Sequence, residues 1–136
     1  MRNLSQLDVV WLAADEIGKL AAMITAGAGP IPMAVLRGSV DVLLLEESLL
    51  QLPIRSRAVL RTDVPDPTSY RELSERGLFV YDWTDVHLPS SMAKQAYELV
   101  AEPSEALMLS EVDYRLQAAA FPMDSEVIGC SLISVP

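Results

Sequence analysis

Three side chains near residue 85 could bind a metal ion or transfer a proton: Asp82, Asp85 and His87. Two carboxylates and an imidazole at the end of a strand could converge on a divalent ion. The spacing matches no established metal-binding motif, and the sequence contains one His. A turn in which the carboxylates accept hydrogen bonds from backbone amides accounts for the same residues. We therefore expect no metal, no cofactor and no catalytic residue, and we keep a small metal- or ligand-binding enzyme at this corner as an alternative.

Other candidates for catalysis lack the neighbours that they would need. The single cysteine, Cys130, is expected to be a small buried hydrophobe within the apolar segment 127–135. No serine lies in a Gly-x-Ser-x-Gly motif. Acidic pairs such as Glu46 and Glu47 fall on predicted solvent faces, whereas acid–base catalysis needs a carboxyl whose pKa is shifted by burial or by a close partner. The sequence favours a non-enzymatic binding protein.

The charge of the chain limits its partners. Nineteen acidic residues against ten basic ones give a net charge of −9. A surface of this sign repels the phosphate backbone of nucleic acids and anionic membrane surfaces. The sequence also lacks an apolar run long enough for a membrane-spanning helix and an N-terminal segment typical of a signal peptide. We expect a cytoplasmic protein that binds neither nucleic acid nor membranes and whose natural partner is a basic protein.

The acidic corner is positioned by the segment Gly77–Trp83, the run of the sequence richest in β-favouring residues. Because apolar residues occupy both of its faces, we expect a strand in the middle of a sheet. Helices are predicted at about 67–76, with Asp66 as the N-cap, and at about 40–52, with Ser39 as the N-cap.

Three further segments complete the predicted sheet. Asp8–Ala14 and Lys19–Thr25 are apolar runs separated by a short acidic turn that ends in Gly18, which predicts an antiparallel hairpin; a continuous helix over the same residues is the alternative. Ser56–Thr62 is expected to be an edge strand, and Ala96–Glu102 a half-exposed strand. The predicted fold is one α+β domain over residues 1–136, a largely antiparallel sheet with two or three helices packed on one side.

Two of the predicted strands, Gly77–Trp83 and Ala96–Glu102, carry acidic residues that suggest a binding surface. Glu98 and Glu102 are expected to face water from one strand, and Asp82 and Asp85 to lie at the end of the central strand beside two aromatic residues. Aromatic anchors among carboxylates suit a cationic protein surface. The predicted partner-binding residues are Tyr81, Asp82, Trp83, Asp85, Glu98 and Glu102. The alternative is that the charge serves solubility alone.

Two stretches resemble a group of small bacterial proteins that includes suspected immunity proteins of polymorphic toxin systems. The first is Trp11–Pro32, with its Ala-Gly-Ala-Gly-Pro-Ile-Pro end, and the second joins Arg76–Trp83 to Tyr97–Pro103. The resemblance covers less than half of the chain and transfers no catalytic residue. It implies a binder that blocks a basic toxin.

The remaining alternative is a structural subunit that forms a homodimer by pairing its 127–135 segments.

Overall fold

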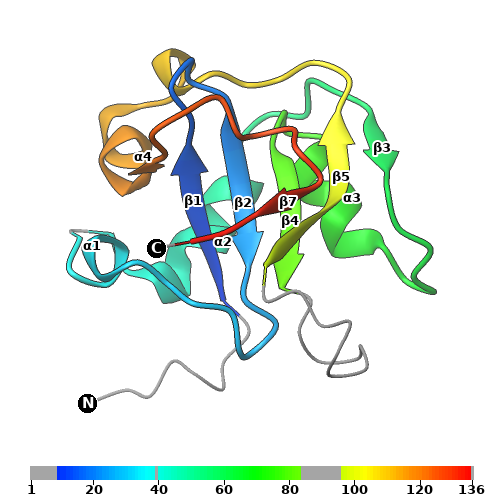
Figure 1. The fold of residues 1–136 in the computed structure, drawn as a ribbon. Coiled ribbons are helices and arrows are strands. Elements are labelled where there is room, and N and C mark those ends of the chain that lie inside the picture. The colour runs from blue at the N-terminus through cyan, green and yellow to red at the C-terminus, as the bar shows by residue number, and fades with distance from the viewer. Residues whose placement is uncertain (1–8, 39, 84–95, 136) are drawn as a thin grey trace.

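The computed structural model describes residues 9–38, 40–83 and 96–135, in which seven strands form one mixed sheet (Figure 1). The strands are β1 (Val10–Ala14), β2 (Leu20–Ile24), β3 (Ala58–Leu60), β4 (Phe79–Trp83), β5 (Tyr97–Pro103), β6 (Phe121–Pro122) and β7 (Leu132–Ile133). The helices are α1 (Met33–Leu36), α2 (Val42–Leu50), α3 (Thr68–Ser74) and α4 (Tyr114–Ala119). The strand order is β3-β5-β4-β2-β1-β6, with β7 also paired to β5. This confirms the α+β class.

The sheet combines antiparallel and parallel pairs. Strand pairs β1–β2, β3–β5, β4–β5 and β5–β7 are antiparallel, whereas β1–β6 and β2–β4 are parallel. The parallel β2–β4 pair requires a long crossover, and this crossover contains α1, α2, β3 and α3. The expected central position of β4, between β2 and β5, and the edge position of β3 are both confirmed.

The predicted N-terminal hairpin is also confirmed, and its turn is built around one carboxylate. Asp15 Oδ1 accepts hydrogen bonds from the amides of Ile17, Gly18 and Lys19 at 3.2, 3.1 and 2.9 Å. Gly18 has a φ of +98°, a conformation that residues with a Cβ rarely adopt. This local turn chemistry favours the hairpin over the continuous helix.

The two predicted helices occur with shifted ends. Helix α2 is capped by Asp41, whose side chain accepts a hydrogen bond from the Leu43 amide at 3.0 Å. The predicted cap, Ser39, lies outside the described residues. Helix α3 starts at Thr68, and the Asp66 side chain accepts from the Thr68 amide at 3.1 Å. At the start of both helices, an aspartate side chain accepts a hydrogen bond from the backbone amide two residues later in the chain.

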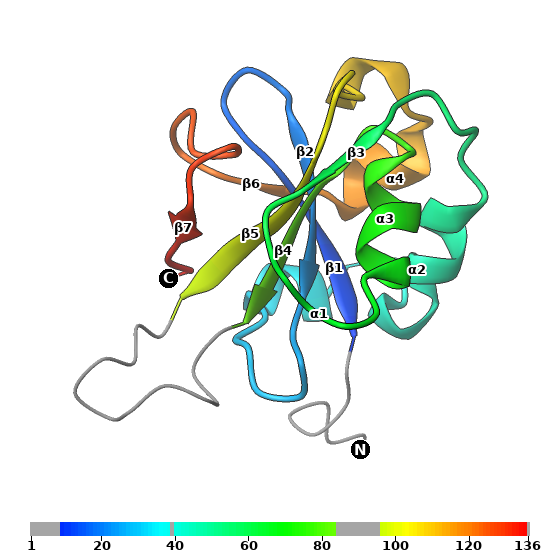
Figure 2. The ribbon, with the colours of Figure 1, turned by 90° about the vertical axis from the view of Figure 1, so that its right-hand side faces the viewer.

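Different layers cover the two faces of the sheet, as Figure 2 shows. Helices α2, α3 and α4 pack on one face, and their core includes Leu45, Leu73 and Leu116. The opposite face is covered by residues 121–135, which we call the C-terminal strap. Its buried side chains are Ile128 and Ile133, which pack against the aromatic residues of that face.

A tyrosine hydroxyl holds the strap on the sheet. Tyr81 is fully buried; its hydroxyl accepts a hydrogen bond from the Gly129 amide at 2.9 Å and donates one to the Cys130 carbonyl oxygen at 2.6 Å. The Cys130 side chain itself is exposed, so the expected burial of this residue is wrong. The strap is a single layer that directs Ile128 and Ile133 inward and leaves Cys130 on the outside.

Within the described part of the chain, no helix has the length and apolar character needed to cross a bilayer.

Candidate functional site

An acid-lined cavity of about 450 Å³ lies where α2, the loop before α3 and the end of β4 meet. We call it the acidic recess. Glu46 comes from α2, Asp66 from the loop and Asp82 from β4, so the fold brings together carboxylates that are far apart in the sequence. The other lining residues are Val10, Ile24, Ala26, Val64, Pro65, Ser69 and Tyr70. Of the described residues that line the recess, none is Lys or Arg, so the recess suits a cationic group.

Asp82 and Glu46 are half-buried, whereas Asp66 is exposed. The Asp82 side chain accepts a hydrogen bond from the hydroxyl of Tyr70 on α3. In the β4–β5 pair, Asp82 lies opposite Glu98, and side chains opposite one another project from the same face of a sheet. The exposed Glu98 therefore adds a second negative charge next to the recess.

Asp66 remains charged at the outer side of the recess. Hydrogen bonds from the Thr68 hydroxyl and then the Thr68 amide lower the pKa of its carboxyl below the usual range. Because both bonds favour the charged form, this carboxylate stays ionised in neutral and mildly acidic solution.

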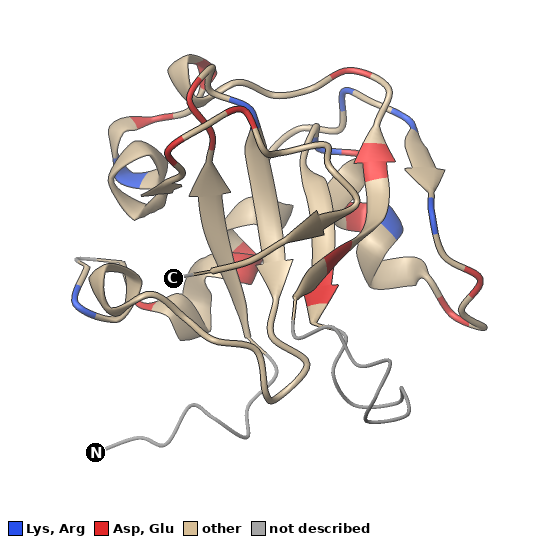
Figure 3. Cartoon of the chain, in the orientation of Figure 1, with Lys and Arg blue, Asp and Glu red and all other residues tan. Residues whose placement is uncertain are grey.

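The basic residues that the structure describes lie outside the lining of the recess. Figure 3 shows acidic residues gathered where β4 ends, where β5 begins and along the loop between β3 and α3. Several basic side chains are paired: Arg55 with Glu111 at 3.1 Å, and Arg61 with Glu102 at 2.7 Å. The charge of the recess is thus not neutralised by these arginines.

The predicted partner-binding residues do not form one surface. Tyr81 is fully buried beneath the strap and cannot contact a partner in this conformation. Trp83 is half-buried and packs edge-on against Tyr97, with ring centroids 5.2 Å apart. Asp85 and the alternative metal ligand His87 lie outside the described residues.

A β-bulge separates the two glutamates that were expected to face water together. Val80 lies opposite Ala101, but Tyr81 lies opposite Leu99, so Val100 is an extra residue on β5. Val100 and Ala101 both enter the helix-side core. Beyond the bulge, the alternation of β5 side chains between the two faces of the sheet is reversed. Glu102 therefore projects from the face opposite to Glu98. The prediction of a shared water-facing row is therefore wrong.

Sequence reasoning missed Glu46, Asp66 and Tyr70 as members of a site. Glu46 was expected on a solvent face, and Asp66 was predicted to be the N-cap of α3, whereas the N-cap is Pro67 and Asp66 is the residue before it. Their approach to Asp82 depends on the crossover between β2 and β4, for which the local sequence gives no signal. Among the described residues, no three His, Cys, Asp or Glu side chains are arranged to hold a metal ion.

The comparisons with known proteins add no relative. Comparison with protein-family models, with curated proteins and with solved structures finds no match to this chain. The resemblance to immunity proteins stays a prediction.

Proposed function

We propose that this protein is a non-enzymatic binding module that receives a Lys or Arg side chain of a basic partner protein in the acidic recess. The observation that carries the proposal is the convergence of three carboxylates from separate elements, Glu46, Asp66 and Asp82, on one cavity. A cation that enters such a cavity gains from several carboxylates at once.

The remaining walls of the recess suit the stem of a long basic side chain. Val10, Ile24 and Val64 supply apolar surface, along which the methylene groups of Lys or Arg can pack while the charged end reaches carboxylates. Tyr70 positions the Asp82 carboxylate through its hydrogen bond. The recess therefore offers both parts of the contact that a basic side chain needs.

The more specific form of this proposal is an immunity protein that blocks a basic toxin, and it rests on the resemblance of two sequence stretches. Carboxylates would take the place of the toxin's anionic substrate. The net charge of −9 would speed association with a basic partner, with a marked dependence on salt. The single cysteine fits the reducing cytoplasm as the site of action.

The first test uses a peptide of alternating Gly and Lys and a matched peptide with Gln in place of Lys. We expect the Lys peptide alone to shift the backbone amide resonances of Asp66, Tyr70 and Asp82 in an NMR titration. A tenfold increase in salt should weaken its binding. Equal shifts with the Gln peptide would show that charge recognition is not the function of the recess.

Matched variants locate the contact. Asp82→Asn keeps an oxygen that accepts the Tyr70 hydrogen bond but removes the charge, and it should weaken Lys-peptide binding about tenfold. Glu46→Gln should weaken it about threefold. Glu47→Gln, on the next residue of α2 but outside the recess lining, should have no effect. If Glu47→Gln matched Glu46→Gln, binding would reflect net charge and not the recess.

A further inference from the structure

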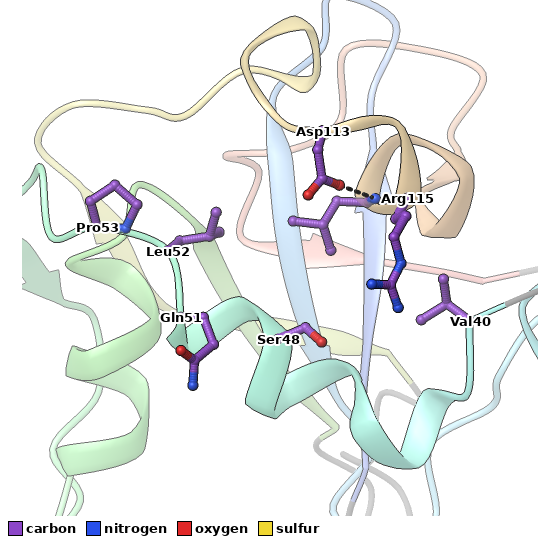
Figure 4. A pocket seen from close by; sticks show the side chains of 8 residues that line it. Val40, Ser48, Gln51, Leu52, Pro53, Asp113 and Arg115 are labelled. Atoms are coloured by element: carbon purple, nitrogen blue, oxygen red, sulfur yellow. Dashed lines mark hydrogen bonds between the residues drawn. The ribbon is translucent and has the colours of Figure 1, made fainter.

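A second cavity, of about 310 Å³, lies between α2 and α4 and does not depend on the acidic recess (Figure 4). Leu52 and Leu116 contribute apolar surface, and Leu116 belongs to the helix-side core. Ser48, Asp113 and Arg115 are among the polar side chains that line it. The lining is divided evenly between apolar residues (Val40, Leu52, Pro53 and Leu116) and polar ones (Ser48, Gln51, Asp113 and Arg115), and cavities that combine apolar walls with convergent polar groups are typical of small-molecule sites.

Arg115 is the basic residue that lines this cavity. Figure 4 shows its side chain extending from α4 toward α2, with Ser48 on the facing side of α2. Among the described residues, Arg115 forms no ion pair, whereas Arg55 and Arg61 each pair with a glutamate. Arg115 can therefore offer its forked N–H groups to a ligand carboxylate in two parallel hydrogen bonds.

The other polar groups define where a carboxylate would sit. The Ser48 hydroxyl makes a long 3.4 Å hydrogen bond to the Leu44 carbonyl oxygen, so it can turn to donate to a ligand at little cost. Asp113 Oδ1 accepts from the Leu116 amide at 3.0 Å, and its negative charge repels an anion from that side of the cavity. The favourable position is between Arg115 and Ser48.

We propose that this cavity binds a small organic monocarboxylate with an apolar body. Its carboxylate pairs with Arg115 and accepts a hydrogen bond from Ser48, while its apolar body packs on Leu52 and Leu116. The proposal is independent of the binding of a basic partner at the acidic recess. The negative charge of the whole protein opposes binding of any anion, so the local contact with Arg115 must supply the selectivity.

The test uses 4-fluorophenylacetate and its uncharged analogue 4-fluorophenylacetamide, both followed by fluorine NMR up to about 10 mM. We expect saturable binding of the carboxylate, with protein methyl shifts at Leu52 and Leu116, and no saturable binding of the amide. Arg115→Gln should weaken carboxylate binding at least about tenfold, and Ser48→Ala about threefold.

Arg37→Gln is the matched control because it removes the same charge from an exposed position that does not line this cavity. It should leave carboxylate binding unchanged within about twofold. Arg115 is exposed, and a far-ultraviolet circular dichroism spectrum equal to that of the unmodified protein would show that Arg115→Gln folds. Three results would each overturn the proposal: no carboxylate binding over the tested range, equal binding of the amide, or equal losses from Arg115→Gln and Arg37→Gln.

Discussion

Asp82 and Glu98 lie directly opposite one another in the antiparallel β4–β5 pair, so two carboxylates project from the same face of the sheet. Like charges in this arrangement destabilise a strand pair. One of the two, Asp82, is held by the Tyr70 hydroxyl and lines the acidic recess, while Glu98 is exposed. A cation bound in the recess would offset this repulsion.

Removing one charge of this pair should stabilise the protein. We expect Glu98→Gln to raise the free energy of unfolding by about 0.5 kcal/mol in low salt, with a smaller gain in high salt because exposed charges are screened. Urea unfolding at the two salt concentrations measures the change. Glu105→Gln removes an equal charge from an exposed loop; an equal gain from this control would mean that net charge, and not the pair, is responsible.

Gly77 should not tolerate a side chain. Its φ is +94°, and an added Cβ would lie 2.7 Å from both the Cβ and the backbone nitrogen of Leu107. We expect Gly77→Ala to lower the free energy of unfolding by about 2–4 kcal/mol, measured by urea unfolding. Gly38→Ala is the control, since a Cβ there meets its nearest atoms at 3.4 Å. A loss below about 0.5 kcal/mol for Gly77→Ala would contradict the close approach of Gly77 to Leu107.

The Tyr81 hydroxyl should anchor the C-terminal strap. Tyr81→Phe removes two part-buried hydrogen bonds, one from the Gly129 amide and one to the Cys130 carbonyl oxygen, which together contribute about 1–3 kcal/mol. We expect a loss of stability in this range and faster hydrogen exchange at Gly129. Tyr114→Phe, at a side chain that is 79% exposed, should change neither quantity. Unchanged exchange at Gly129 in Tyr81→Phe would show that the strap is held in another way.

Two buried tyrosines should make the protein sensitive to alkaline pH. Burial raises the pKa of Tyr97 to about 12, and burial also raises the pKa of Tyr81. Up to pH about 10, the tyrosines are protonated in both the folded and the unfolded chain, and their contribution to stability is complete. Above this pH, the unfolded chain loses protons that the folded chain retains. The free energy of unfolding should therefore fall between pH 10 and 12, by at most about 1.4 kcal/mol per pH unit for each tyrosine.

Urea unfolding at a series of pH values from 8 to 12 tests this expectation. Tyr97→Phe removes one titrating group and should reduce the slope above pH about 10, although it also lowers stability at neutral pH by removing the hydroxyl that Trp11 Nε1 contacts at 3.1 Å. An unchanged slope in Tyr97→Phe would mean that Tyr97 titrates alike in both states.

The sequence was sufficient to predict those helices and strands whose positions depend on nearby residues. The hairpin of β1 and β2 follows from the turn at Gly18, and the end of α3 follows from Gly77, because glycine readily adopts the positive φ that a tight turn or the chain after a helix requires. The central place of β4 follows from apolar residues on both faces. Each of these signals lies within the segment that it organises.

Features that depend on distant segments could not be predicted in this way. The bulge at Val100 arises from the register between β4 and β5 and decides on which face Glu102 lies. The exposure of Cys130 depends on how the strap crosses the sheet. Asp82 was predicted as a site residue, but its neighbours Glu46 and Tyr70 reach it only through the packing of α2 and α3.

The position of the strap along the chain has a consequence for synthesis. Residues 10–24 leave the ribosome before the strap does and can pair as a hairpin within microseconds. Their aromatic face, however, is completed by Tyr97, which follows Trp11 by 86 residues, and then by the strap itself. A nascent chain that stalls before residue 121 would leave Trp11 and Met23 without this cover, and such a chain is expected to aggregate or to occupy chaperones.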